Sequence, residues 1–364
     1  MDTYEIFLVA PPGLEKFVLA EAQERHFPNP EAVPGGVTFQ GTLDHVVHAN
    51  REMRGAVRVL LRVAEFRAMH MAQLDKRARK VPWGDILVRG GKVHVEATCR
   101  KSKIYHNKGA AERVANAVLA EVGGEVSNEA TVRLKVRIED DLVTISVDTS
   151  GDSLHKRGHK GAVGKAPIRE NLAAVCLRAC NYQTGEPVVD PMCGSGTFPI
   201  EAAEMAIGLH AGRSRSFGYE DLGFKTMAPK AADPQPVAPL FFGYDRDQGA
   251  IQSATANAKQ AGLGGVVTFT RQAISDLTPP TDKKGLVMIN PPYGARIGNK
   301  KQLYGLYGAL GKTLLEHFGG WRVGLVTSEN ALAMATGLPW GEPVGPFPNG
   351  GLRITLHRCT IPQR

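Results

Sequence analysis

The stretch VVDPMCGSGTFPIEAA, residues 188–203, decides the fold class of this 364-residue chain. Its pattern predicts a short buried strand, a glycine loop and then an apolar helix. From residue 167 onward helices and strands alternate, which is typical of a doubly wound parallel sheet. In such α/β folds a ligand binds at the carboxyl end of the first strand. We therefore predict an α/β domain over residues 167–364 with its site at this loop.

The residues of the loop indicate the kind of ligand. Gly194 and Gly196 let the backbone approach a ligand closely, and the helix N-terminus favours an anionic group. A dinucleotide fingerprint would require a third glycine at position 199, where this chain has proline. Asp190 at the strand end would repel a pyrophosphate but suits a cationic amino group. The methionyl part of S-adenosylmethionine carries both an ammonium and a carboxylate, so we predict S-adenosylmethionine as the cofactor.

A second strand, residues 240–244, ends in Asp245, which can accept both hydrogen bonds of a ribose diol. Asp247 is better placed to cap the helix expected over residues 250–261. Residues 210–240, between the glycine loop and this strand, form an insertion that either contacts the substrate or is only a surface loop.

A third strand, residues 285–289, runs into Asn290-Pro291-Pro292-Tyr293. An amino group conjugated with a ring is a poor nucleophile, because its lone pair is delocalised. The Asn290 amide oxygen and the Pro291 carbonyl can accept its two N–H hydrogens and favour a pyramidal nitrogen. The two prolines fix the backbone, and the Tyr293 ring can stack on a flat base. This turn predicts methyl transfer to an amino nitrogen by positioning and electrostatics.

The first half of the chain differs in its charge composition. The whole chain has a formal net charge of +8, yet residues 51–113 alone carry sixteen Lys and Arg against six Asp and Glu. Such a segment is the footprint expected of a phosphate-binding surface, or else a solvated charged face. Within it, residues 100–108 form a basic loop that contains Tyr105. Residues 3–64 form a small α+β unit, and residues 151–166 have the composition of a linker.

Other protein classes are excluded by composition. No uncharged apolar stretch reaches the roughly 18–20 residues of a membrane helix, and the acidic start predicts no secretory signal. Five cysteines without a C-x-x-C pair predict reduced thiols and no structural zinc. We therefore expect a cytoplasmic protein that binds no metal and no membrane, with a monomer as the expected oligomeric state.

These motifs resemble the class I S-adenosylmethionine-dependent methyltransferases that act on an amino nitrogen. More narrowly, the chain is similar to the THUMP-domain RNA guanine-amino methyltransferases. The similarity extends nearly from end to end. It includes FLVAPPGLE at 7–15, residues 97–114, LHKRG at 154–158, the glycine-loop string at 190–203, NPPYGARIG at 290–298 and the 210–240 insertion.

The resemblance implies a domain order and roles for single residues. The order is an N-terminal ferredoxin-like domain at 1–64, a THUMP RNA-binding domain at 65–150, a linker at 151–166 and a Rossmann-like methyltransferase domain at 167–364. The implied cofactor residues are Asp190, Met192, Cys193, Gly194, Ser195, Gly196, Thr197 and Asp245. Either Gln272 or Asp276 would contact the adenine. The implied catalytic residues are Asn290, Pro291, Pro292 and Tyr293. The RNA contacts expected from the basic segments are Lys101, Lys103, Tyr105, Lys108 and Arg157.

The expected activity is methylation of a guanine exocyclic amine, in 23S rRNA first and in tRNA second. A DNA adenine or protein glutamine methyltransferase would use the same Asn-Pro-Pro-Tyr chemistry. The basic first half argues against a protein substrate, and the lack of an added target-recognition segment after Gly294 argues against DNA. A non-catalytic RNA-binding assembly factor would be expected to lose Asp190 or Asn290, and both are present.

Overall fold

The computed structural model describes residues 3–159, 161, 167–224, 235–293 and 300–363. It divides into two compact units. Unit 1 contains Met1–Ala10, Val18–Leu154 and Arg215–Lys230, and unit 2 contains Pro11–Phe17, His155–Ser214 and Ala231–Arg364. Each unit is described by itself, and parts of the predicted linker and of the 210–240 insertion lie outside the described residues.

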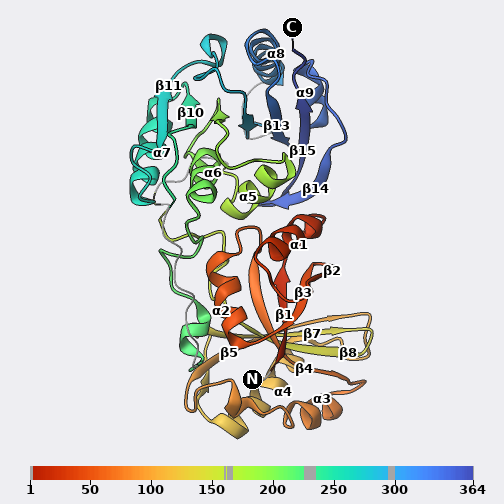
Figure 1. Cartoon of the computed structure of the whole chain (residues 1–364). Helices are drawn as coiled ribbons and strands as arrows, with labels where there is room; N and C mark the ends of the chain where they lie inside the picture. The colour runs from red at the N-terminus through yellow and green to blue at the C-terminus, as the bar shows by residue number, and fades with distance from the viewer. Residues whose placement is uncertain (1–2, 160, 162–166, 225–234, 294–299, 364) are drawn as a thin grey trace. The chain divides into compact units, whose positions relative to one another are not determined.

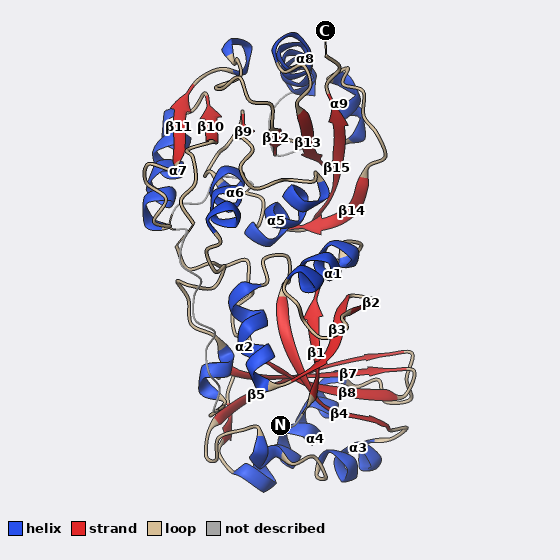
Figure 2. Cartoon of the chain, viewed as in Figure 1, coloured by secondary structure: helices blue, strands red, loops and turns tan. Residues whose placement is uncertain are grey.

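Unit 1 is an α+β unit built on one eight-stranded sheet (Figures 1 and 2). Its strands are β1 Tyr4–Val9, β2 Glu31–Val33, β3 Gly36–Gly41, β4 Arg58–Arg67, β5 Lys92–Arg100, β6 Glu125–Val126, β7 Val132–Glu139 and β8 Leu142–Asp148. Its helices are α2 Leu43–Glu52, α3 Met71–Ala78 and α4 Asn107–Val122, with 3-10 turns η1 Trp83–Asp85 and η2 Gly218–Asp221. Helix α1, Glu15–Glu24, runs across the division between the units. The strand order is β2-β3-β1-β4-β8-β7-β5-β6.

Alternation of apolar and polar residues explains why these segments are strands. In β7, Leu134, Val136 and Ile138 are buried, while the residues between them face the other side of the sheet. β4 pairs with β1 on one side and with β8 on the other, so the sheet continues through residue 64. The proposed boundary between the first two domains therefore lies inside a strand, and it stays a prediction.

Residues 215–224 of the insertion belong to unit 1, although they follow the glycine loop in sequence. Phe217 and Tyr219 are buried and stacked, with ring centroids 5.2 Å apart. The Arg215 guanidinium donates hydrogen bonds to the backbone carbonyls of Ser150 and Ser153, at 2.9 and 2.8 Å. This part of the insertion completes the packing of unit 1.

Unit 2 is a seven-stranded, mostly parallel sheet with helices packed on it (Figure 2). Its strands are β9 Val188–Asp190, β10 Phe241–Asp245, β11 Val267–Arg271, β12 Leu286–Ile289, β13 Arg322–Thr327, β14 Val344–Asn349 and β15 Leu352–Thr360. Its helices are α5 Glu170–Ala179, α6 Thr197–Ile207, α7 Gln248–Gln260, α8 Lys300–His317 and α9 Asn330–Ala335, with the 3-10 turn η3 Ile274–Asp276. The three strands predicted around the site are confirmed to within one or two residues at either end.

The strand order of unit 2, β11-β10-β9-β12-β13-β15-β14, reverses direction at β9. From β9 the chain moves outward to β10 and β11, and it then returns to add β12 on the other side. Parallel sheets bind ligands outside the carboxyl ends of the strands at such a switch point. The residues that follow β9 and β12 are the glycine loop and Asn290, the two motifs that the sequence singled out.

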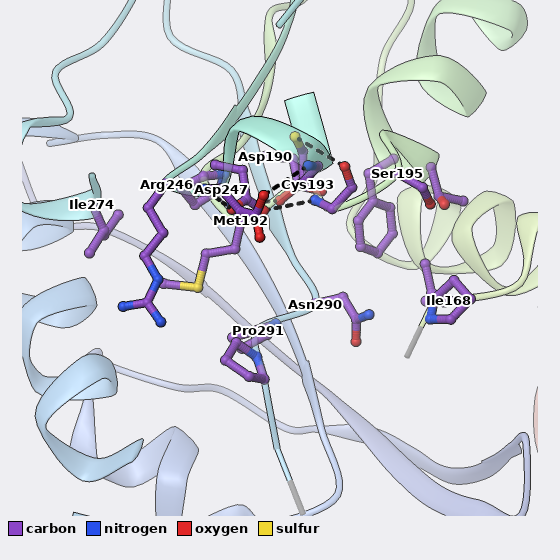
Figure 3. Close-up of a pocket in the computed structure, with 18 of the residues that line it drawn as sticks. Ile168, Asp190, Met192, Cys193, Ser195, Arg246, Asp247, Ile274, Asn290 and Pro291 are labelled. Atoms are coloured by element: carbon purple, nitrogen blue, oxygen red, sulfur yellow. Dashed lines mark hydrogen bonds between the residues drawn. The ribbon is translucent and has the colours of Figure 1, made fainter. Parts of the chain in front are cut away.

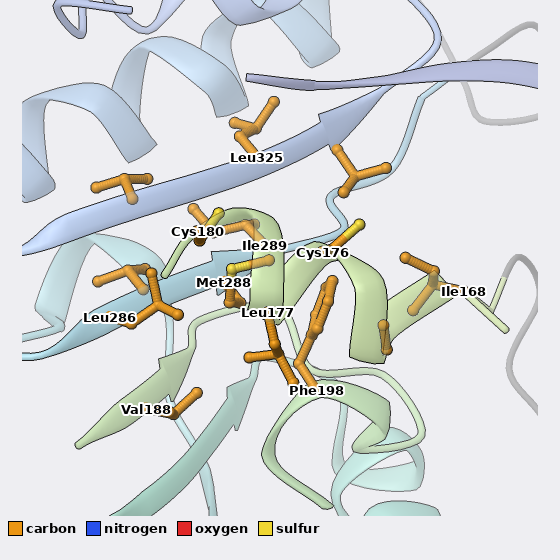
Figure 4. Packing of buried hydrophobic residues seen from close by; sticks show 14 of the residues in the cluster. Ile168, Cys176, Leu177, Cys180, Val188, Phe198, Leu286, Met288, Ile289 and Leu325 are labelled. Atoms are coloured by element: carbon orange, nitrogen blue, oxygen red, sulfur yellow. The ribbon is translucent and has the colours of Figure 1, made fainter. Parts of the chain in front are cut away.

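The core of unit 2 is continuous beneath this edge. All four residues of β12 are buried, because a central parallel strand is covered on both faces. Figure 4 shows Cys176 and Leu177 of α5, Phe198 of α6 and Met288 and Ile289 of β12 packed together. The strand ends that carry the candidate site are therefore held on a rigid base.

The described residues contain neither a membrane-spanning helix nor a cluster of metal-binding side chains. None of the helices there combines the length and the apolar character that crossing a membrane requires. Within the same residues, His, Cys, Asp and Glu side chains do not gather in groups of three or more that could hold a metal ion.

Candidate active site

The candidate site is a cavity of about 620 Å³ at the carboxyl ends of β9, β10 and β12 (Figure 3). The structure brings together residues from segments that lie far apart in sequence, from Pro167 to Leu306. The predicted site residues that line the cavity are Asp190, Met192, Cys193, Gly194, Ser195, Thr197, Asp245, Gln272, Asn290, Pro291, Pro292 and Tyr293. Their roles stay predictions, but their convergence on one cavity is a property of the fold.

The glycine loop requires glycine at two positions for different reasons. Gly194 and Gly196 have φ angles of 53° and 83°, a region that favours glycine. A Cβ on Gly194 would meet open space, whereas a Cβ on Gly196 would lie 2.7 Å from the Phe269 ring. The lack of a side chain at Gly196 therefore lets the start of α6 pack against β11. The lack of one at Gly194 leaves the loop open towards the cavity. Helix α6 begins at Thr197, so its N-terminus points at the site.

Asp190 ends β9 and is only 2% exposed. One of its carboxylate oxygens accepts a hydrogen bond from the Met192 backbone N–H at 3.1 Å. Burial raises the pKa of Asp190 well above its ordinary value, and the negative charge of Asp245 raises it further. A cationic group that enters the cavity would favour the ionised form of this carboxyl.

Asp245, at the end of β10, contacts the glycine loop directly. One carboxylate oxygen accepts from the Gly194 N–H at 3.1 Å, and the other accepts from the Asp247 N–H at 2.9 Å. Asp247 is the N-cap of α7, since its carboxylate accepts from the N–H groups of Gly249 and Ala250. The predicted cap is therefore confirmed.

Gln272 and Asp276 were the two candidates for an adenine contact. Gln272 follows β11, lines the cavity, and donates its side-chain N–H to the Asp276 carbonyl at 2.8 Å. The Asp276 side chain is exposed, accepts from the Ser275 hydroxyl at 2.9 Å and is not part of the lining. The geometry favours Gln272 and leaves Asp276 outside the site.

The Asn290-Pro291-Pro292-Tyr293 turn continues β12 into the cavity wall. The Tyr307 hydroxyl of α8 donates to the Pro292 carbonyl at 3.3 Å and so braces the turn from behind. Tyr293 is 6% exposed, and burial raises the pKa of its hydroxyl against the opposing effect of a hydrogen bond with Asn349. The residues that follow Tyr293, 294–299, lie outside the described residues.

The sequence reasoning missed several residues of the lining. Ile168, Arg246, Ile274 and Leu306 come from four separate segments, and only Arg246 adjoins a predicted site residue. The position of Ile274 soon after β11 could have indicated it, because that strand ends at the same edge of the sheet. Nothing in the sequence marks Leu306, which reaches the cavity because of how α8 packs.

The expected RNA contacts of unit 1 lie at the surface. Lys101, Lys103 and Lys108 are exposed, and Tyr105 is 84% exposed. Asp141 fixes the loop by accepting from the Lys103 backbone N–H at 2.8 Å. Lys108 lies in the first turn of α4 rather than in the predicted loop, because that helix begins at Asn107.

Arg157 does not fit its expected role. Its side chain is 1% exposed, and its guanidinium pairs with Glu201 at 3.1 Å inside unit 2. A buried cation with a carboxylate partner is not available to an RNA phosphate. The assignment of Arg157 as an RNA contact is therefore wrong for this structure.

The donor and acceptor groups of the cavity fit S-adenosylmethionine. Asp190 would hold the ammonium, the N-terminus of α6 the carboxylate, and Asp245 the ribose hydroxyls. The cavity volume is within the range of small-molecule sites, about 300–1,000 Å³. Asn290 lines the same cavity, as a methyl acceptor site requires.

Comparison with known proteins agrees with this geometry. The family described as "RMKL-like, methyltransferase domain" matches residues 157–340, and the family described as "RlmL ferredoxin-like domain" matches residues 5–60. Among curated proteins, "Ribosomal RNA large subunit methyltransferase K/L" of Syntrophotalea carbinolica is 34% identical over 99% of this chain and 54% of its own length. The chain thus spans about half the length of the curated relatives it matches.

Two solved structures are similar over the whole chain. A "predicted N6-adenine-specific DNA methylase" from Listeria monocytogenes is 29% identical with a TM-score of 0.87, covering 100% of this chain and 97% of its own. A protein described as "a putative methyltransferase complexed with SAH" is 27% identical, also with a TM-score of 0.87, covering 100% of this chain and 99% of its own. Unit 2 is thus a Rossmann-like methyltransferase fold, and the N-terminal match is ferredoxin-like. Because the methyltransferase match covers just over half of the residues, the chain belongs to the RMKL-like methyltransferase-domain family.

Proposed function

We propose that the protein transfers a methyl group from S-adenosylmethionine to the exocyclic amine of a guanine in large-subunit ribosomal RNA. The observation that carries the proposal is the convergence of Asp190, Asp245 and Asn290 on one cavity at the switch point of the sheet. The names of the curated relatives support ribosomal RNA as the substrate. A methyltransferase of ribosomal RNA would act in the cytoplasm.

In this proposal each side of the cavity has its own task. Asp190, Met192, Cys193 and the loop from Gly194 to Thr197 hold the methionyl part of the cofactor. Asp245 holds the ribose and Gln272 contacts the adenine.

Asn290 and the Pro291 carbonyl accept the hydrogens of the target amine, so that its lone pair points at the methyl group. Pro292 keeps the turn rigid, and Tyr293 bounds the base plane. In the reaction the amine nitrogen would attack the methyl carbon, the electron pair of the broken carbon–sulfur bond would stay on sulfur, and the nitrogen would pass one proton to solvent.

Unit 1 would supply RNA affinity. Lys101, Lys103 and Lys108 are exposed cations close to Tyr105 in sequence. Several cations on the strands of the sheet are instead paired with carboxylates, as Lys135 is with Glu96 at 2.6 Å. Exposed lysines beside an exposed aromatic ring suit phosphates and an unstacked base. We therefore keep residues 65–150 as the proposed THUMP RNA-binding domain.

A DNA adenine substrate is the second candidate, because the Listeria structure carries that description. The test uses labelled S-adenosylmethionine with protein-free large-subunit RNA, transfer RNA and duplex DNA, all from a strain that lacks the gene. Nucleosides from each reaction are separated and identified by mass. We expect N2-methylguanosine in ribosomal RNA. Methylated adenine in DNA, or methylation of transfer RNA alone, would overturn the proposed substrate.

A further inference from the structure

The segment from His155 to His159 looks like a basic surface stretch in the sequence, but much of it is buried in unit 2. Arg157 is 1% exposed and His159 is 7% exposed. Nη2 of Arg157 lies 3.1 Å from Oε1 of Glu201, and both side chains are almost completely buried. A buried charge is costly unless it is paired, so this contact is specific.

Both buried carboxylates on this side belong to α6, the helix that begins at the glycine loop. Helix α6 is almost entirely buried, and its two carboxylates, Glu201 and Glu204, are themselves buried and lie one turn apart. Oε1 of Glu204 lies 2.6 Å from Nη2 of Arg213 and 3.3 Å from Nε2 of His159. The two carboxylates of this helix are therefore held by three basic residues that flank the helix in sequence. Arg157 and His159 precede α6, and Arg213 follows it.

The same segment lies directly behind the loop that faces the cofactor cavity. A separate cavity of about 10 Å³ is lined by His159 and Glu201 together with Ser195 and Thr197. The Asn257 amide, which lines the same small cavity, donates to the Ser195 carbonyl at 3.0 Å. Gly196 packs so closely on Phe269 that the start of α6 has no free space on that side. A displacement of α6 would therefore be transmitted to the loop.

We propose that Arg157 is a positioning residue for the cofactor loop, acting through its buried pair with Glu201. The inference rests on the proposed function, since it assumes that the loop binds S-adenosylmethionine. Glu201 stands four residues after Thr197, the first residue of α6. The pair fixes how the first turns of α6 are rotated about the helix axis and where they lie along it. The position of these turns in turn determines the direction of the N–H groups of the loop.

Three variants of the full chain separate this role from its alternatives. Arg157→Lys keeps the charge but loses the guanidinium fork. The double variant Arg157→Met/Glu201→Gln removes both charges together, so no lone charge remains buried and the fold should be retained. Lys156→Met is the matched control, because it removes one positive charge from an exposed neighbour. Thermal unfolding, calorimetric titration with S-adenosylmethionine and RNA affinity as a function of salt are measured for each.

We expect the double variant to bind S-adenosylmethionine on the order of tenfold more weakly, since small misplacements of a site are costly. Arg157→Lys should lie between it and the unaltered chain, and Lys156→Met should bind the cofactor normally. The salt dependence of RNA binding should stay the same for both Arg157 variants.

Unchanged cofactor affinity in folded Arg157→Lys and in the folded double variant would overturn the inference and leave Arg157 with a purely structural role. A shallower salt dependence in the Arg157 variants would overturn it in favour of an RNA contact. If the unaltered chain bound no S-adenosylmethionine at all, the proposed function itself would be overturned, and the inference with it.

Discussion

The carboxylate of Asp245 accepts a hydrogen bond from the backbone N–H of Gly194 at 3.1 Å, so the end of β10 holds the glycine loop that follows β9. The loop is thus fixed from three directions. Asp245 holds it from the side, Phe269 packs under Gly196, and Asn257 bonds the Ser195 carbonyl. Preorganisation of this kind lowers the cost of ligand binding.

Asp245→Ala should weaken S-adenosylmethionine binding by about tenfold to a hundredfold, because it removes a charged acceptor and releases Gly194. Asp247→Ala is the control, since it removes the α7 cap and should lower the unfolding free energy by about 1 kcal/mol with little loss of affinity. Calorimetric titration and thermal unfolding distinguish the two. Equal effects of both variants on affinity would contradict a ribose-binding role for Asp245.

Asp190 predicts a pH dependence of cofactor binding. Burial and Asp245 raise its pKa, so the carboxyl of the free protein keeps its proton above the ordinary aspartate pKa of about 3.9. A bound ammonium favours the ionised form, so affinity should increase as pH rises through the raised pKa and binding should release a proton. Titrations in buffers of different ionisation enthalpy measure that proton. Asp190→Asn should abolish tight binding together with proton release.

The same raised pKa has a consequence for stability. Between the ordinary and the raised pKa the folded state binds more protons at Asp190 than the unfolded state does, so its contribution to stability falls as pH rises. Asp190→Asn should therefore unfold at a temperature equal to or higher than that of the unaltered protein at neutral pH. A large loss of stability in this variant would show that Asp190 supports the fold rather than a ligand.

His155 predicts sensitivity to acid. Burial lowers its pKa from 6.5 to about 4, so the unfolded chain binds a proton in this interval that the folded chain does not. Stability from this residue is complete above pH 6.5 and is lost as pH falls towards 4. His155→Gln should flatten the plot of unfolding free energy against pH in this range. A variant whose stability depended on pH as that of the unaltered protein does would contradict the assignment.

The sequence was sufficient for the strands of the site because glycine, proline and acidic residues mark where buried strands end. Asp190 and Asp245 end β9 and β10, and Asn290 follows the fully buried β12. Parallel strands bring their carboxyl ends to one edge of the sheet. Arg157 could not be read correctly, because its partner Glu201 is 44 residues away and only the fold shows that both are buried. Leu306 was missed for the same reason, since tertiary packing alone places it at the cavity.

The RNA surface of unit 1 is tested by replacing Lys101, Lys103 and Lys108 with Ala together. Each lost phosphate contact should shallow the slope of log affinity against log salt by roughly 0.7 to 0.9. The control removes the same charge from Lys92, Lys135 and Arg137, which are paired with Glu125, Glu96 and Glu139. We expect the first triple variant to lose both affinity and slope and the control to keep most of both. A larger loss of affinity and slope in the control than in the first triple variant would place the RNA surface on the sheet.

The last prediction separates binding from chemistry at the target base. Asn290 lines the cavity and would accept a hydrogen from the amine, so Asn290→Ala should lower the single-turnover rate by on the order of a hundredfold or more. Affinity for S-adenosylmethionine and for RNA should stay nearly unchanged, because neither depends on this amide.

Tyr293 supplies the comparison. Its hydroxyl bonds Asn349, and Tyr293→Phe keeps the ring, so this variant should have a mild effect on rate. Tyr293→Ala should instead weaken capture of the base, because it removes the ring that bounds the base plane. Labelled cofactor, ribosomal RNA and enzyme in excess give the single-turnover rate directly. If Asn290→Ala transferred methyl groups as fast as the unaltered protein, the Asn-Pro-Pro-Tyr turn would be structural, and the mechanism would have to rest on another acceptor.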